Sequence, residues 1–159
     1  MIRDNKITLS VDCMGGDNSV DDIIGGVNQF CSENANDTLL LHGDKKALSR
    51  ALDKYPEIKK MCKIRHCDKV IQMGDKPSQS IRGGKNSSMW NSIESVKSSK
   101  AEVAISCGNT GSLMAISTLL LRKLPEVKRP AIAIFWPSTS DQGFNVVLDA
   151  GADIKAQPS

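Results

Sequence analysis

Two glycine-rich turns contain the residues of this sequence that are best suited to bind an anion. One is Asp12–Asp17, with the sequence DCMGGD, and the other is Ser106–Ser112, with the sequence SCGNTGS. An apolar run typical of a strand precedes each turn, and a helical pattern follows it. Glycine permits positive φ and close approach of a ligand, and a helix start offers unpaired N–H groups with partial positive charge. Each turn is therefore a candidate site for phosphate or another oxyanion.

A basic, hydroxyl-rich segment at residues 74–88 lies between the two turns in the sequence. Its cations Lys76, Arg82 and Lys85 could contact a phosphate, and the Arg82 guanidinium could bind two oxygens at once. The segment also offers the neutral hydroxyl donors Ser78, Ser80, Ser87 and Ser88. A solvated surface loop with ordinary charges is the alternative interpretation, and the residue types leave both open.

Acidic and amide side chains near the turns are further candidates. Asp12, Asp17 and Asp149 stand where a carboxylate could orient a ligand, and Asn109 and Thr110 could donate to an oxyanion. Helix capping is the competing interpretation for Asp17, and ordinary turn chemistry is the competing interpretation for Asn109 and Thr110.

Several other chemistries lack their usual motifs in this sequence. There is no G-x-x-x-x-G-K-[ST] loop, and Gly108-x-x-Gly111 is too short to indicate a dinucleotide fingerprint. His42 and His66 stand near strand ends without a Ser/His/Asp arrangement, which favours structural roles. The five cysteines form no C-x-x-C pair and no zinc spacing, so we expect a reducing, cytosolic setting and no metal site.

The composition is that of an ordinary globular protein. The chain has 159 residues, 40% hydrophobic and 25% charged, which fits one domain with a core of its own. The net charge of +3 is mild, and the basic residues are scattered among few aromatics, so no nucleic-acid partner is indicated. No segment approaches the ~20 apolar residues that cross a bilayer.

Hydrophobic periodicity predicts alternating strands and helices. Strands are expected at 7–11, 38–42, 63–67, 103–105, 131–136 and 145–148. Helices are expected after Ser19, after Asp44, from Ser88, and at 113–121, where the helix is apolar on most sides and should be buried. Pro77 and the pair Gly83–Gly84 argue against one unbroken helix in the basic segment. The pattern indicates an α/β fold with a largely parallel sheet, which places both turns at the carboxyl edge of the strands.

Five stretches in this order resemble the bacterial phosphate acyltransferases of phospholipid synthesis, the acyl-carrier-protein:phosphate acyltransferases. They cover nearly the whole chain, and the combination is specific although each piece alone is weak. The stretches are Asp12–Asp17, Lys76–Arg82, Lys85–Met89, Ser106–Met114 and Val147–Ala152.

The resemblance implies an enzyme that transfers a fatty acyl group from acyl carrier protein to inorganic phosphate. The product would be an acyl phosphate, which a membrane acyltransferase uses on glycerol 3-phosphate. It also implies an isocitrate-dehydrogenase- or phosphotransacetylase-like sheet with helices on both faces, a homodimer, and no cofactor or metal. The protein would be cytoplasmic and could associate peripherally with the inner face of the membrane. The residues expected to bind phosphate or substrate are Asp12, Gly15, Gly16, Asp17, Lys76, Ser78, Arg82, Lys85, Ser87, Ser88, Asn109, Thr110, Gly111 and Asp149.

The sequence departs from the family in its extent. Family members are longer, and their second half carries a G-E-E-like turn followed by lysine and a D-G-F-x-G-N turn, neither of which occurs here. Asp153 stands where the family usually has Asn. We therefore expect residues 1–159 to be the N-terminal part of one truncated α/β acyltransferase domain, without its C-terminal half and with catalytic residues unknown.

Two other functions remain open. The chain could be a catalytically inactive remnant that retains phosphate binding, or a nucleotide- or phosphosugar-binding α/β domain.

Overall fold

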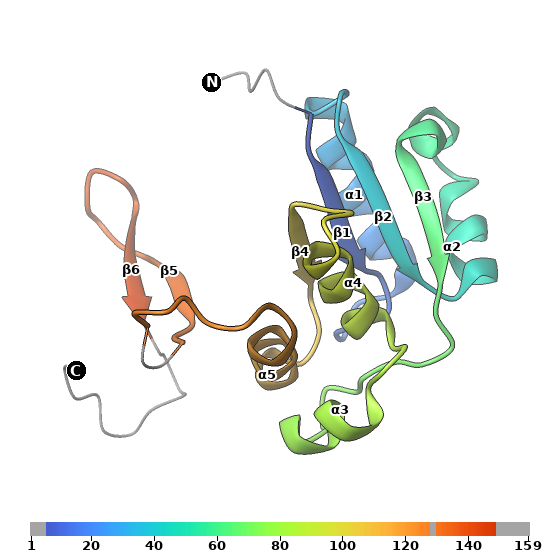
Figure 1. The fold of residues 1–159 in the computed structure, drawn as a ribbon. Helices are drawn as coiled ribbons and strands as arrows, with labels where there is room; N and C mark the ends of the chain where they lie inside the picture. Colours follow the sequence, from blue (N-terminus) through green and yellow to red (C-terminus); the bar gives the residue numbers. More distant parts are fainter. Residues whose placement is uncertain (1–5, 128–129, 149–159) are drawn as a thin grey trace. The chain divides into compact units, whose positions relative to one another are not determined.

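The computed structural model describes residues 6–127 and 130–148 and divides the chain into two compact units, residues 1–122 and 123–159 (Figure 1). Among the described residues, the first unit contains one parallel sheet of four strands in the order β3-β2-β1-β4. The strands are β1 (Thr8–Asp12), β2 (Thr38–Gly43), β3 (Cys62–His66) and β4 (Val103–Ser106). The predicted α/β class and the parallel sheet are therefore confirmed.

One face of the sheet carries the larger apolar core. Side chains alternate between the two faces of a strand, so Leu9 and Val11 of β1 lie on the same side. Val11 and Leu41 pack there against Ile24 of α1 (Val20–Glu33) and Leu48 of α2 (Lys45–Leu52). A 3₁₀ turn, η1 (Pro56–Met61), closes this core with Ile58 and Met61. The helix α1 begins after Ser19, as predicted, and a capping box starts it, in which Ser19 and Asp22 satisfy each other's backbone N–H groups.

The opposite face, under α4 (Ser88–Lys97), is more polar. Ser10 of β1 points to this side and lies 2.9 Å from the Nε2 atom of His42, and Ser95 of α4 lies 3.3 Å from the same nitrogen. All three side chains are buried. Apolar packing on this side comes from Met89 and Ile93, which form a second, smaller core with Ile116 of α5 (Thr110–Leu121). Figure 1 shows α4 across the sheet from α1 and α2.

The helices α3 (Pro77–Gly83) and α5 lie beyond the carboxyl ends of the strands (Figure 1). As predicted, no unbroken helix spans the basic segment, because α3 ends before Gly84 and α4 begins at Ser88. The expectation that α5 is buried on most sides is wrong for its described surroundings. Ile116 is fully buried, but Leu119 and Leu121 remain 49% and 43% exposed, because this helix packs mainly against α3 and α4 within the first unit.

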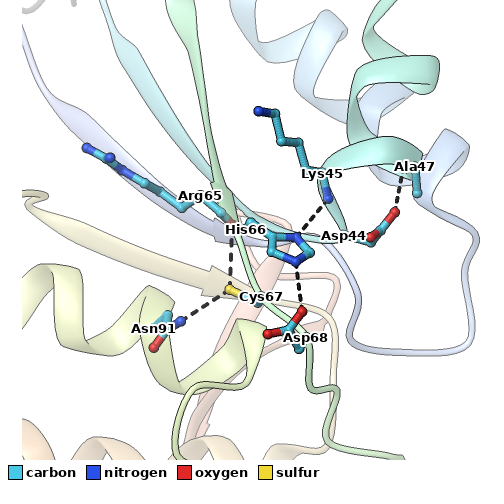
Figure 2. Close-up of polar contacts among 8 residues, drawn as sticks. All are labelled: Asp44, Lys45, Ala47, Arg65, His66, Cys67, Asp68 and Asn91. Carbon is cyan, nitrogen blue, oxygen red and sulfur yellow. Dashed lines mark hydrogen bonds and ion pairs between the residues drawn. The ribbon is translucent and has the colours of Figure 1, made fainter.

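Residues at the carboxyl end of β3 and just after it make hydrogen bonds to helices on both faces of the sheet (Figure 2). The Nδ1 atom of His66 accepts from the backbone N–H of Lys45 at the start of α2, at 3.1 Å, and its Nε2–H donates to Asp68 at 2.8 Å. On the other face, the Asn91 amide of α4 donates to the Cys67 sulfur at 3.2 Å. His66, like His42, therefore has the structural role that its position in the sequence favours.

The second unit contains an antiparallel hairpin of β5 (Ala133–Pro137) and β6 (Phe144–Leu148). Both strands were predicted near these positions, but they pair with each other rather than in parallel. Phe135 and Phe144 meet edge to face with ring centroids 4.7 Å apart. The candidate residue Asp149 lies outside the described residues. Throughout the described residues, no helix is both long enough and apolar enough to cross a membrane.

The buried histidine predicts a dependence of stability on pH. Burial lowers the pKa of His42 to about 4; the nearby Asp12 opposes this shift and Arg65 adds to it. The unfolded imidazole titrates near 6.5, so its stabilising contribution is complete above that pH and is lost as pH falls toward 4. We expect a loss of up to roughly 3 kcal/mol in the free energy of unfolding over this interval. Urea denaturation at a series of pH values measures it.

Two variants separate this effect from other titrations. His42→Gln should show a shallower decrease between pH 6.5 and 4, whereas His66→Gln, which leaves His42 in place, should keep the slope of the unmodified chain. Equal slopes for His42→Gln and the unmodified chain would contradict the prediction.

Candidate functional site

The two glycine turns meet at the carboxyl edge of the sheet. β1 and β4 are neighbours, and their register places Asp12 opposite Ser106, so each strand delivers its turn at the same level. A methyl group placed on Gly15 would lie 3.0 Å from the Cα atom of Gly108. The predicted shared edge is confirmed.

A buried carboxylate joins the turns. The Ser106 hydroxyl donates to Oδ2 of Asp12 at 2.7 Å, and the backbone N–H of Gly108 donates to the same serine oxygen at 3.0 Å. The other carboxylate oxygen accepts from the N–H of Met14 at 3.2 Å. Asp12 is only 2% exposed, so these donors replace the water that its charge loses on burial. Asp12 therefore positions both turns.

Sequence reasoning did not select Ser106 as a site residue. A signal for it exists, because Ser106 directly follows the predicted strand 103–105 just as Asp12 directly follows the predicted strand 7–11. Its partner can be named only once the strand order is known.

Glycine is required at the first turn for two separate reasons. Gly16 has φ +96°, a conformation that side chains strongly disfavour, and a methyl group there would collide with the carbonyl oxygen of Cys107. The second turn is therefore packed against the backbone of the first. A side chain on Gly16 would force them apart.

Several backbone N–H groups of the turns have no hydrogen-bond acceptor recorded among the described residues. Those of Met14 and Gly108 are used within the turns, as described above. Within residues 6–127 and 130–148, no acceptor is recorded for the N–H groups of Gly15, Gly16, Asp17, Thr110 or Gly111. Asp17 is exposed and caps no helix, because Ser19 caps α1; the capping interpretation of Asp17 is wrong.

The start of α3 lies against the second turn. A methyl group on Gly111 would lie 3.0 Å from the ring of Pro77, and the hydroxyls of Ser80 and Ser112 are 2.8 Å apart. Lys76 and Ser78, which flank Pro77, are exposed beside this contact. The structure therefore brings the first part of the basic segment to the turns.

Asn109 has the structural role that turn chemistry predicts. Its Oδ1 caps α5 by accepting from the N–H of Ser112 at 2.9 Å. Its amide nitrogen donates to the carbonyl oxygens of Met73 and Asp75, at 2.7 and 3.0 Å. This one side chain fixes the loop before α3 against the second turn.

No contact with either turn is recorded, among the described residues, for the later part of the basic segment. Arg82 and Lys85 are exposed, and within the described part of the chain no ion pair and no contact with either turn is recorded for them. Ser87 caps α4 by accepting from the N–H of Trp90 at 3.2 Å. The hydroxyl of Ser88 is buried, and no partner for it is recorded among the described residues.

The assembled groups suit an oxyanion better than a metal or a thiol-dependent reaction. Free N–H groups and Lys76 supply positive potential at one edge of the sheet. Burial and the neighbouring Asp12 raise the pKa of the Cys13 thiol, which disfavours its thiolate. In the part of the chain that the structure describes, no group of three or more His, Cys, Asp or Glu residues is placed to hold a metal ion.

Comparison with known proteins identifies the family. Residues 7–159 match the family described as "Fatty acid synthesis protein". A phosphate acyltransferase of Cereibacter sphaeroides is 49% identical over 151 residues, which are 95% of this chain and 41% of that protein. Those of Roseobacter denitrificans and Paracoccus denitrificans are 46% and 47% identical, with 43% and 40% of their lengths covered. The chain thus spans about two fifths of these relatives. With the match extending over residues 7–159, the chain belongs to the fatty acid synthesis protein family.

Proposed function

We propose that this chain supplies the phosphate-binding part of a phosphate acyltransferase that transfers a fatty acyl group from acyl carrier protein to inorganic phosphate. The observation that supports it best is the contact between two glycine turns, several of whose N–H groups have no recorded acceptor among the described residues. The names of the relatives support the reaction class. In this proposal residues 1–159 form part of one α/β acyltransferase domain, and the acyl phosphate passes to a membrane acyltransferase that acts on glycerol 3-phosphate.

The chemistry requires two anionic centres to be held together. A phosphate oxygen attacks the thioester carbonyl carbon, a C–O bond forms and the C–S bond breaks. The sulfur of the carrier leaves as a thiolate and takes up the proton that the attacking hydrogenphosphate loses. Negative charge develops on the carbonyl oxygen during the attack, and fixed N–H donors stabilise such charge without reorganising. The two turns offer separate sets of donors, one for the phosphate and one for the carbonyl oxygen. Lys76 beside the second turn adds a cation.

The alternative is an inactive remnant that retains phosphate binding. Phosphate, thioester carbonyl and oxyanion donors must be fixed together, and a misplacement of ~1 Å can lower the rate ~100-fold. Phosphate binding requires fewer groups to be fixed together, because N–H donors and a cation already attract an anion.

We expect Gly16→Ala to weaken phosphate binding at least about tenfold. The added methyl group meets the Cys107 carbonyl in a conformation that alanine disfavours, so the turns must separate. Isothermal titration calorimetry with inorganic phosphate measures the affinity, and circular dichroism checks the fold. Gly83→Ala is the matched control, because a methyl group at Gly83 meets nothing within 4 Å. Equal affinities in the two variants would argue against a site at the turns.

The basic segment gives a second prediction. Lys76→Ala and Arg82→Ala should each weaken phosphate binding about tenfold or more, because a hydrogen bond to a charged group is lost. Lys97→Ala, in the last turn of α4, should leave the affinity unchanged. If Arg82→Ala behaves like Lys97→Ala, then Arg82 belongs to the solvated surface and takes no part in phosphate binding.

A turnover assay separates the proposal from its alternative. The readout is release of free acyl carrier protein from a long-chain acyl carrier protein in phosphate buffer. We expect the 159-residue chain to bind phosphate and to show little or no turnover by itself. Sustained turnover that Gly16→Ala abolishes would show that these residues hold a complete site. Absence of both turnover and phosphate binding would count against both forms of the proposal.

A further inference from the structure

We propose that an apolar groove between α1 and the β1–β4 edge of the sheet binds the alkyl chain of a neutral acyl thioester. This inference rests on the proposed function and locates the substrate's hydrocarbon part. The groove encloses about 320 Å³, within the range of small-molecule sites. Its apolar walls are formed by Leu9, Val11, Ile23, Val27, Phe30 and Ile105.

The groove is open because the sheet has an uncovered apolar margin there. β4 is an edge strand within the described residues, and its side chains Val103 and Ile105 remain 43% and 40% exposed. Phe30 of α1 is half-buried on the opposite wall. Removal of such a surface from water is favourable in proportion to its area, so an aliphatic ligand gains affinity with each methylene that it buries.

The polar end of the groove identifies the kind of molecule that fits. Asp12 and Cys107, which belong to the two glycine turns, line it together with Asn18 and Asp22 near the start of α1. Phe30 and Leu9 lie toward the opposite end, because α1 runs back along the strands. A ligand lying in the groove therefore places its head at the candidate phosphate site. The carboxylate of Asp22 at this end repels a free fatty acid anion and admits an uncharged thioester.

Two adjacent glycines of α1 allow a matched test. Gly26 lines the groove, and a methyl group there would meet nothing within 4 Å. Gly25 does not line it, and a methyl group there would lie 3.7 Å from the Tyr55 hydroxyl. Gly26→Leu should fill the groove, whereas Gly25→Leu makes the same change of helix propensity outside it.

The probe is the decanoyl thioester of N-acetylcysteamine, compared with its butanoyl homologue, titrated into the chain labelled at isoleucine methyl groups. Ile23 and Ile105 line the groove and should shift, whereas Ile58 and Ile93 lie in the two cores and should not. Affinity should rise up to about fourfold for each methylene buried. Gly26→Leu should weaken decanoyl binding at least about tenfold, and Gly25→Leu should leave it unchanged.

Equal affinities for the two thioesters, or equal effects of the two leucine variants, would overturn the inference. A dimer in sedimentation velocity that only Gly26→Leu dissociates, without thioester binding, would assign the groove to a second copy and also overturn it. Titration of inorganic phosphate into the same samples separates the two proposals. Phosphate binding without alkyl binding overturns the groove alone. Length-dependent alkyl binding without phosphate binding supports the groove while the proposed function fails.

Discussion

The candidate site depends on one buried interaction, the acceptance of the Ser106 hydroxyl proton by Asp12. A carboxylate that is 2% exposed is stable only with donors around it, and here they come from the two turns that it joins. Because Ser106 in turn accepts from Gly108, the conformation of the second turn is coupled to the first strand. The parallel register of β1 and β4 is what makes this bond possible. The other N–H groups of the turns are thereby held in place, and several of them have no recorded acceptor among the described residues.

The two faces of the sheet differ in polarity. The face under α1 and α2 is apolar and continues into the open groove beside β4. The face under α4 buries a polar seam of Ser10, His42 and Ser95, in which Nδ1 of His42 lacks a recorded partner among the described residues. Acidification therefore acts on the fold through the α4 side, whereas an apolar ligand would act through the α1 side. The two glycine turns lie at the carboxyl edge of the sheet, which both faces share.

Local sequence signals predicted the parts of this structure that local physics determines. Alternation and capping gave the strands and the start of α1, and the Gly15–Gly16 turn was identified because glycine permits positive φ. The role of Ser106 could not be predicted, because it depends on which strands are neighbours. The exposure of Leu119 depends likewise on which elements pack against α5. The position of Arg82 relative to the turns could not be predicted either. The loop before α3 is fixed by the side chain of Asn109, which lies 36 residues after Met73, the loop residue that it contacts.

Asp12 lies where the two glycine turns meet, and its own hydrogen bonds and charge leave it unsuited to bind phosphate directly. Both of its oxygens already accept hydrogen bonds, and its negative charge would repel the ligand. Alternation along β1 turns the Asp12 carboxylate to the face under α4, together with Ser10, and away from the groove walls that Leu9 and Val11 form. Asp12 therefore acts by holding the two turns together. An anion at this edge would have to meet the N–H groups of the turns that have no recorded acceptor among the described residues.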